Sequence, residues 1–257
     1  MATDGGTWAS RCLRGVAAER LPLALAELHR ALPVGCMLDL TVCGRDGLDR
    51  SRPDDDPLHD LLVGAGFEPA DRGRMTAGGG SAPGSLVARA QRARTLPDTV
   101  GPDMRLLICG LNPSLYSADA GVGFARPGNR FWPAALAAGL ASVARDPDHA
   151  LRQHGMGMTD LVKRATVAAD ELTTAEYRSG LARVERLVRR LRPGAVCFVG
   201  LAGWRAAVDR RARPGRQARG LGDAPVYVMP STSGLNARTS LDELTAHFRE
   251  ATAVAAG

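Results

Sequence analysis

The sequence predicts an α/β fold, a three-layer α/β/α arrangement around a central, mostly parallel sheet, with a small α/β segment before it. From about residue 95, short apolar runs suited to buried strands alternate with helical patterns, the order typical of parallel sheets covered on both faces. Two of these runs, Met104–Cys109 and Pro225–Met229, each lead into a polar loop rich in Gly, Pro, Asn or Ser. We expect both loops at one edge of the sheet, where open α/β sheets bind ligands.

Residues 1–92 are expected to form the added segment, an accessory α/β domain. Apolar residues recur at helical spacing in AERLPLALAELHRAL until Pro33 and Gly35 break the pattern. The run MLDLTV alternates apolar and polar residues, as a half-buried strand does. The elements expected here are an irregular stretch over 1–18, a helix over 18–32, a strand over 37–42, a charged loop over 44–56, a helix over 57–66, and strands over 67–74 and 85–90.

A basic, proline-containing linker over 90–103 leads into the larger part, residues 93–257, which we expect to form the second domain. Thr173 with Glu176, and Ser240 with Glu243, have the spacing of capping boxes at helix starts. The elements expected here are a strand over 104–109, a helix over 134–144, a loop and short helix over 146–157, a polar loop over 158–166, a helix over 174–191, a strand over 195–199, a helix over 200–209, a basic loop over 210–219, a strand over 225–229 and a helix over 240–255.

Composition narrows the function classes. The chain of 257 residues carries a net charge of +6, which favours polyanionic partners. No apolar run approaches the roughly 18 residues of a membrane helix, and no signal peptide is evident, so we expect a cytoplasmic protein. The five cysteines are odd in number and lack C-x-x-C spacing, which predicts reduced, mostly buried thiols instead of disulfides or a metal site. They are Cys12, Cys36, Cys43, Cys109 and Cys197.

The stretch from Met104 to Pro133 is the most unusual part of the chain. A buried strand breaks at Gly110 and delivers Asn112 to its carboxyl end, and Phe124 follows twelve residues later. A Pro-Gly-Asn-Arg-Phe-Trp run then opens a helix. An asparagine before proline also serves ordinary turns, and a phenylalanine also fills cores, so both alternatives remain open from the residues alone.

Three blocks, GLNPSLYSADAGVGFARPGNRFWP, MTDLVKRAT and MPSTSGLNAR, resemble the signature regions of the mismatch-specific uracil/thymine DNA glycosylases of the uracil-DNA glycosylase superfamily. The resemblance covers about residues 93–250 and implies that residues 93–257 are the catalytic domain. It implies a monofunctional enzyme of base excision repair that flips uracil, or thymine or a modified pyrimidine, from its mispair with guanine and hydrolyses the N-glycosidic bond. It also implies double-stranded DNA as partner, with single-stranded DNA as a further candidate, a monomer, and no cofactor or metal.

The resemblance assigns roles to the residues of the first two blocks. Asn112 would position the water, because an amide orients water but is a poor base, and Thr166 would help to hold it. Phe124 would stack on the flipped base, and backbone N–H groups of Leu111 and Phe124 would donate to its carbonyls. Asp160 and Asn129 would support the loops. The residues expected to line the base pocket are Leu111, Ser114, Ser117 and Phe124.

The third block would contact DNA. Leu235, between Gly234 and Asn236, matches a wedge that fills the space of the flipped nucleotide. Ser231 and Arg238 would meet phosphates, as hydroxyl and guanidinium groups do. Lys163, Arg164 and Arg130 are weaker candidates for phosphate anchors.

One departure concerns the substrate. The family usually has glycine where this chain has Ser114, and we expect the serine to narrow the pocket or to change the substrate preference.

Two alternatives follow from the same residues. The protein could bind DNA lesions or mismatches without cleaving them, with a pocket altered at Ser114. Residues 18–92 weakly resemble the C-terminal half of a class I methyltransferase, which suggests either a methyltransferase-like remnant or an enzyme centred on that segment. The glycine-rich cofactor loop of such enzymes is missing from this chain, which argues against the enzyme.

Overall fold

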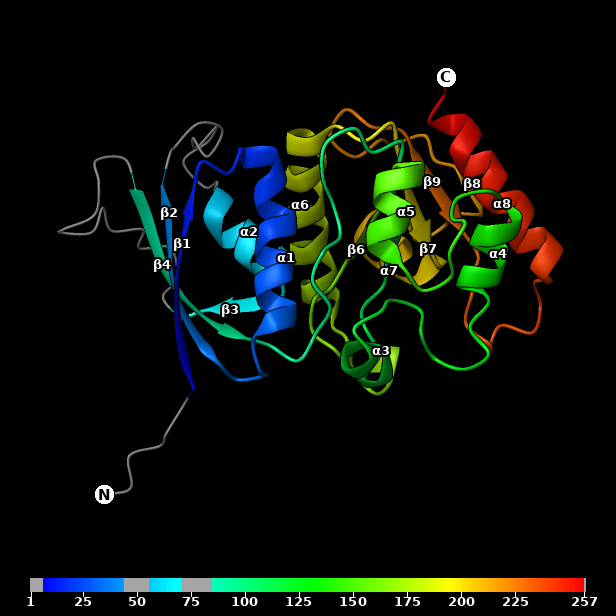
Figure 1. Ribbon diagram of the computed structural model, residues 1–257. Helices are drawn as coiled ribbons and strands as arrows, with labels where there is room; N and C mark the ends of the chain where they lie inside the picture. The colour runs from blue at the N-terminus through cyan, green and yellow to red at the C-terminus, as the bar shows by residue number, and fades with distance from the viewer. Residues whose placement is uncertain (1–6, 44–55, 71–84, 257) are drawn as a thin grey trace.

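The computed structural model describes residues 7–43, 56–70 and 85–256. They form two sheets with helices between and beside them (Figure 1). The smaller sheet is built from the N-terminal residues, and the larger sheet from residues after the linker.

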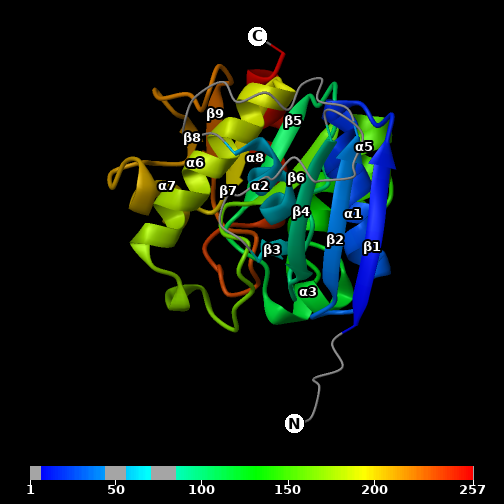
Figure 2. The same cartoon turned by 90° about the vertical axis from the view of Figure 1, so that its left-hand side faces the viewer.

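The N-terminal sheet has four strands in the order β1-β2-β4-β3. Its strands are β1 (Trp8–Arg14), β2 (Met37–Cys43), β3 (Phe67–Pro69) and β4 (Ser85–Arg92). A short 3-10 turn (Ala18–Arg20) leads into α1 (Leu21–Ala31), and α2 (Pro57–Gly64) follows β2. The two helices cover one face of the sheet, where alternate residues of β2 pack against leucines of α1 and α2. Figure 2 shows β1, β2 and β4 side by side, with their other face turned away from the helices.

Strand β1 corrects the expected irregular N-terminus. It pairs in parallel with β2, from Trp8 opposite Met37 to Arg14 opposite Cys43. The stretch WASRCLR carries little apolar periodicity because β1 is an edge strand and most of its side chains are exposed. Part of the strand expected over 67–74 lies outside the described residues, and β3 itself ends at Pro69.

The larger sheet has five strands in the order β6-β5-β7-β9-β8, and all pair in parallel except β8. This confirms the predicted α/β fold with a mostly parallel sheet. The strands are β5 (Leu106–Gly110), β6 (Met156–Asp160), β7 (Ala195–Val199), β8 (Gly215–Arg216) and β9 (Val226–Met229).

Helices cover both faces of this sheet. On one face α6 (Thr174–Leu191) and α7 (Leu201–Ala207) bury their apolar side chains against alternate residues of β5, β7 and β9. On the other face lie α4 (Phe131–Ala137), α5 (Pro147–His154) and α8 (Leu241–Val254). The capping boxes expected at Thr173 and Ser240 are present at the starts of α6 and α8.

Several local expectations in this part are wrong, and one is the basic loop over 210–219, which contains β8. Residues 156–160 form β6, although the sequence MGMTD has no β-branched apolar residue, because the strand pairs along its whole length with β5. A short helix, α3 (Leu115–Ala120), interrupts the loop after β5. The helix expected over 134–144 is α4, which begins earlier and ends at Ala137, just before Gly139 with φ 75°.

The two sheets are joined through α6, which lies between α1 and α2 on one side and the larger sheet on the other (Figure 1). Arg186 of α6 forms an ion pair with Asp60 of α2. The N–H of Asp98, in the linker, donates to the carbonyl of Gly64 at the end of α2. The helices of the N-terminal segment therefore attach the N-terminal sheet to the larger sheet.

The cysteines are free thiols, as expected. Three of them, Cys36, Cys109 and Cys197, are buried, whereas Cys12 is exposed on β1. Within the part of the chain that the structure describes, no cluster of three or more metal-ligating side chains occurs. The described helices are each too short or too polar to cross a membrane.

Candidate active site

The candidate site forms where β5 and β6 end beside each other. Gly110 and Asp160 are paired in register at these two strand ends. The loops that follow stay together, because Leu161 N–H donates to the Gly110 carbonyl and Val162 N–H to the Leu111 carbonyl, both at 2.9 Å. The first two sequence blocks thus form a single surface at the carboxyl edge of the sheet.

Asn112 and Thr166 lie in these two loops and contact each other. Asn112 Nδ2 donates to Thr166 Oγ1 at 2.8 Å and to the Arg164 carbonyl at 3.0 Å. Two backbone hydrogen bonds between Pro113, Leu115 and Thr166 hold the loops in this register. The amide N–H₂ group is thereby committed to protein acceptors, whereas Oδ1 has no partner among the described residues. Oδ1 is free to accept a hydrogen bond from water.

Phe124 is held in a strained conformation next to these strand ends. Its φ is 58°, a left-handed value that bulky residues rarely adopt and that tends to occur at functional sites. One face of the ring stacks on Phe131, with centroids 4.0 Å apart and planes 7° apart. The Trp132 indole N–H donates to the Gly123 carbonyl at 2.9 Å, which fixes the segment before Phe124. A rigid, half-buried aromatic platform results.

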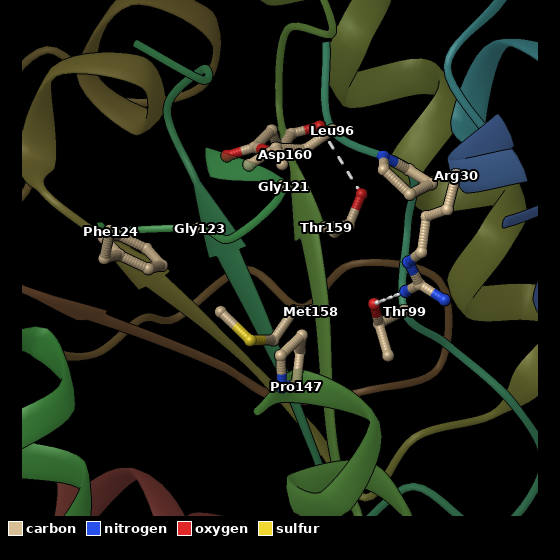
Figure 3. Close-up of a pocket in the computed structure, with 11 residues that line it drawn as sticks. Arg30, Leu96, Thr99, Gly121, Gly123, Phe124, Pro147, Met158, Thr159 and Asp160 are labelled. Carbon is tan, nitrogen blue, oxygen red and sulfur yellow. Dashed lines mark hydrogen bonds between the residues drawn. The ribbon is translucent and has the colours of Figure 1, made fainter. Parts of the chain in front are cut away.

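A pocket opens beside this platform (Figure 3). Phe124 lies on one side of it and Arg30 with Thr99 on the other, while Met158, Thr159 and Asp160 come from β6. Arg30 belongs to α1, so the N-terminal segment forms part of the wall. Of the four residues expected in a base pocket, Phe124 lines this one, and Leu111, Ser114 and Ser117 are not among its lining residues.

Ser114 starts a helix, which the sequence interpretation did not foresee. Its Oγ accepts a hydrogen bond from Ser117 N–H at 3.1 Å as the N-cap of α3, and the two hydroxyls are also 3.1 Å apart. Ser117 is buried. The serine hydroxyls are therefore occupied with each other at the first turn of α3, so the expected narrowing of the pocket by Ser114 is not what this geometry shows.

Two backbone donors near the platform remain available. The N–H groups of Leu111 and Phe124 have no hydrogen-bond acceptor among the described residues. Leu111 follows β5 directly, and Phe124 packs next to Gly110 at its end. Both amides suit a developing negative charge on a carbonyl oxygen, because backbone donors at fixed positions need no reorganisation.

The third sequence block forms a loop that the first block supports. The Arg130 guanidinium donates to the carbonyls of Ser233, Asn236 and Thr239. A Cβ on Gly234 would come within 2.9 Å of the Gly128 carbonyl oxygen, so the two loops touch. The loop presents Leu235, which is 89% exposed. An exposed leucine on a braced loop suits insertion into a base stack.

The other residues of this loop divide into two kinds. Asn236 is internal, since its Nδ2 donates to the Ser231 carbonyl and to Thr239 Oγ1. Ser231 Oγ accepts from the Ser233 N–H at 3.2 Å and keeps its own proton. Arg238 is exposed, and its guanidinium has no partner among the described residues. Ser231 and Arg238 are thus the members free to meet a phosphate.

The three weaker anchor candidates are engaged within the protein. Arg130 braces the third loop, as described above. Arg164 pairs with Glu176 at 2.7 Å and donates to the Glu171 carbonyl. Lys163 Nζ lies 2.8 Å from Asp98 Oδ1, with the lysine side chain largely buried. Their charges therefore hold loops together instead of projecting toward a ligand.

Of the two residues expected to support the loops, Asn129 makes a side-chain hydrogen bond, whereas the Asp160 side chain makes none among the described residues. Asn129 Oδ1 accepts from Phe131 N–H at 2.9 Å at the start of α4. The carboxyl group of Asp160 lies in the pocket without a hydrogen-bond donor among the described residues. Burial raises the pKa of Asp160 to about 6, and Asp98 adds to this rise while Lys163 and Arg183 oppose it.

A buried charge cluster behind the site was not apparent in the sequence. Asp98 accepts from Lys163 Nζ, Arg183 Nη1 and Thr159 Oγ1 at 2.7–2.8 Å. Burial opposes its ionisation, but Arg183 and Lys163 lower the pKa of Asp98 below its ordinary value. Arg183 also donates to the Asp160 carbonyl at 2.7 Å. The cluster thus fixes the end of β6.

Exposed residues around the site were also missed. Tyr116 on α3 is 50% exposed, and Val167, directly after Thr166, is 69% exposed. Arg126 is exposed between Phe124 and Gly128 and has no side-chain partner among the described residues. The signal that could have identified these residues is the exposure of apolar side chains within a motif. This exposure is evident only when the position of α3 is known.

The fold and the site together define a class: a three-layer α/β/α protein with a fixed amide, an aromatic platform and an exposed apolar loop at its sheet edge. The family model of the uracil DNA glycosylase superfamily matches residues 97–255. The chain belongs to this superfamily. Its general activity is accordingly that of a DNA glycosylase, and DNA is its partner.

Proposed function

We propose that the protein is a monofunctional DNA glycosylase that acts on uracil mispaired with guanine and starts base excision repair. Thymine and modified pyrimidines are further candidate substrates. The observation that carries the proposal is the fixed amide of Asn112, whose Nδ2 is bound by Thr166 and the Arg164 carbonyl while Oδ1 stays free. A water that is hydrogen-bonded to Oδ1 would attack C1′ as the bond from C1′ to the base breaks.

The other parts of the site support the same reaction. Phe124 offers one ring face to a flipped base, since Phe131 covers the other. The free amides of Leu111 and Phe124 would stabilise the departing base anion. The chain has a single lysine, Lys163, and its ammonium group is paired with buried Asp98. A Schiff-base route is therefore disfavoured, and the product would be an abasic site.

The test is cleavage of single-lesion duplexes and single strands by the wild type and Asn112→Ala. We expect abasic product from the uracil·guanine duplex, and a loss of roughly 100-fold or more in the variant, because misplacement of a reacting group can cost about 100-fold in rate. Binding without abasic product in the wild type would instead favour a lesion-binding protein. Equal activity in the variant would remove Asn112 from the mechanism.

A further inference from the structure

The proposed mechanism assigns no role to the carboxyl group of Asp160, which lines the pocket beside the platform. Asp160 ends β6, beside Gly110 at the end of β5. A Cβ on Gly110 would collide with Asp160 Oδ1 and would lie 3.4 Å from Phe124 Cζ. Glycine at this position therefore lets the carboxyl group and the aromatic ring lie close together over the strand end, and both line the pocket of Figure 3.

The charged groups around Asp160 do not satisfy its carboxyl group. Lys163 Nζ and Arg183 Nη1 each lie 2.8 Å from the carboxylate of Asp98. Arg183 Nη2 reaches Asp160 only at the backbone carbonyl, at 2.7 Å. Cys109, on β5, is a buried neutral thiol because burial raises its pKa well above the ordinary value. Arg30, which also lines the pocket, pairs with Asp148. Hence these cations are paired with other carboxylates, and the Asp160 carboxyl group has no ionic partner among the described residues.

The chemistry of base release distinguishes the two forms of this acid. When the bond between C1′ and the base nitrogen breaks, the base keeps the electron pair, and the negative charge spreads onto its carbonyl oxygens. A neutral carboxylic acid donates a hydrogen bond to such an oxygen, whereas a carboxylate repels it. Water supplies the new bond to C1′, and its proton is released from the site.

We propose that Asp160 works in its acid form, donating a hydrogen bond to a carbonyl oxygen of the flipped base, and that its ionised form suppresses release of keto bases. The residue thereby sets the pH range of the enzyme and its preference for carbonyl-bearing bases. This inference rests on the proposed glycosylase function. The raised pKa of Asp160, about 6, agrees with the absence of a donor to its carboxyl group.

The first test is the single-turnover rate on the uracil·guanine duplex between pH 5 and pH 8.5. The wild-type rate should fall by roughly 100-fold from pH 5 to pH 8, as the acid fraction of a group with a pKa near 6 falls to about one per cent. Asp160→Asn supplies a permanent donor, so its rate should vary little over this range and should exceed the wild type at pH 8. Asp119→Asn removes an exposed carboxylate that pairs with Arg94, and should keep the wild-type profile.

A second readout does not depend on activity. The carboxyl ¹³C resonance of Asp160 in the free protein, assigned by its loss in Asp160→Asn, should titrate with a midpoint near pH 6. A midpoint below 5, or a pH profile of Asp160→Asn equal to that of the wild type, overturns the inference alone. If the wild type forms no abasic product at any pH on any lesion, the proposed function itself fails, and the inference fails with it.

Discussion

Asn112 Nδ2 lies 2.8 Å from Thr166 Oγ1, and this hydrogen bond joins the loop after β5 to the loop after β6. It is made between residues 54 positions apart in the chain. The contact sets the orientation of the amide, because Thr166 and the Arg164 carbonyl accept its protons and leave Oδ1 exposed to a water. Thr166 is buried and accepts from Asn112, so its own hydroxyl proton remains available for the same water.

Replacing Thr166 should therefore lower the chemical rate without weakening DNA binding. For Thr166→Val we expect at least about a fivefold loss in kcat, the equivalent of a hydrogen bond worth about 1 kcal/mol, with KM unchanged. Thr166→Ser keeps the hydroxyl and should retain most of the activity. Steady-state kinetics on the preferred duplex decide the matter. A loss of equal size in both variants would point to packing of the threonine methyl group.

Leu235 should matter for duplex DNA and little for the fold. Because the side chain is 89% exposed, Leu235→Ala should change the free energy of unfolding by less than about 0.5 kcal/mol. Burial of a leucine in a base stack contributes about 1.5–3 kcal/mol, so kcat/KM on duplex should fall about 10- to 100-fold, with single strands unaffected. Val143→Ala, at another exposed apolar residue outside the strand-end loops, is the matched control. Equal losses on duplex and single strand would contradict a wedge.

Arg238 should contribute one phosphate contact. For Arg238→Ala we expect weaker binding to all duplexes alike, and a salt dependence whose logarithmic slope is smaller by about 1. Fluorescence anisotropy with a uracil-free duplex at several salt concentrations measures this slope. Arg219→Ala, in the basic loop over 210–219, should leave the slope unchanged. If Arg219 has the larger effect, the DNA path runs over that loop instead of over the third block.

Asp98 should be important for stability, because it is the buried partner of two cations. Asp98→Asn leaves Lys163 and Arg183 buried without their carboxylate, and should lower the free energy of unfolding by about 3–5 kcal/mol. Urea denaturation monitored by fluorescence measures the change. Asp39→Asn breaks the exposed pair with Arg89 and should cost less than about 1 kcal/mol.

The pH dependence of stability checks the same cluster. The folded pKa of Asp98 lies below its ordinary value, so the unfolded chain takes up its proton first as the pH falls. The stability that Asp98 contributes is therefore complete above its unfolded pKa, near 4, and is lost as the pH falls through the lower folded pKa. Asp98→Asn should show less of this acid-induced loss than the wild type. An identical acid limb in both proteins would contradict the assignment.

The sequence was sufficient for the elements that carry strong local signals. Apolar runs at β5, β7 and β9, and the capping boxes at Thr173 and Ser240, predicted strands and helices that the structure contains. The sequence was insufficient where an element forms only because its strand pairs with another strand. Strand β6 depends on its register with β5, and Gly157 leaves room there for the side chain of Met104. Edge strand β1 shows no periodicity because its faces are mostly exposed.

The candidate site was predictable in part, for a similar reason. Motif order predicted site positions for Asn112, Thr166, Phe124 and Leu235, and the structure brings Asn112 and Thr166 into contact. Serine is favoured at helix starts, but α3 has only six residues, and Ser117 stands where a capping box has Glu or Gln, so Ser114 alone did not predict the helix. Arg183 and Asp98 are 85 positions apart in the chain. The sequence therefore could not show that Asp98, and not Asp160, pairs with Arg183 and Lys163.

The contacts of Arg130 affect how DNA would be searched. Its guanidinium binds three carbonyl oxygens of the loop that carries Leu235, so that loop loses its conformational entropy when the chain folds and not when DNA arrives. Because the Leu235 loop is already ordered, it does not have to fold each time the protein meets DNA. The time spent at a base pair would then depend on how readily that pair opens, and weak pairs such as mismatches would be sampled fastest.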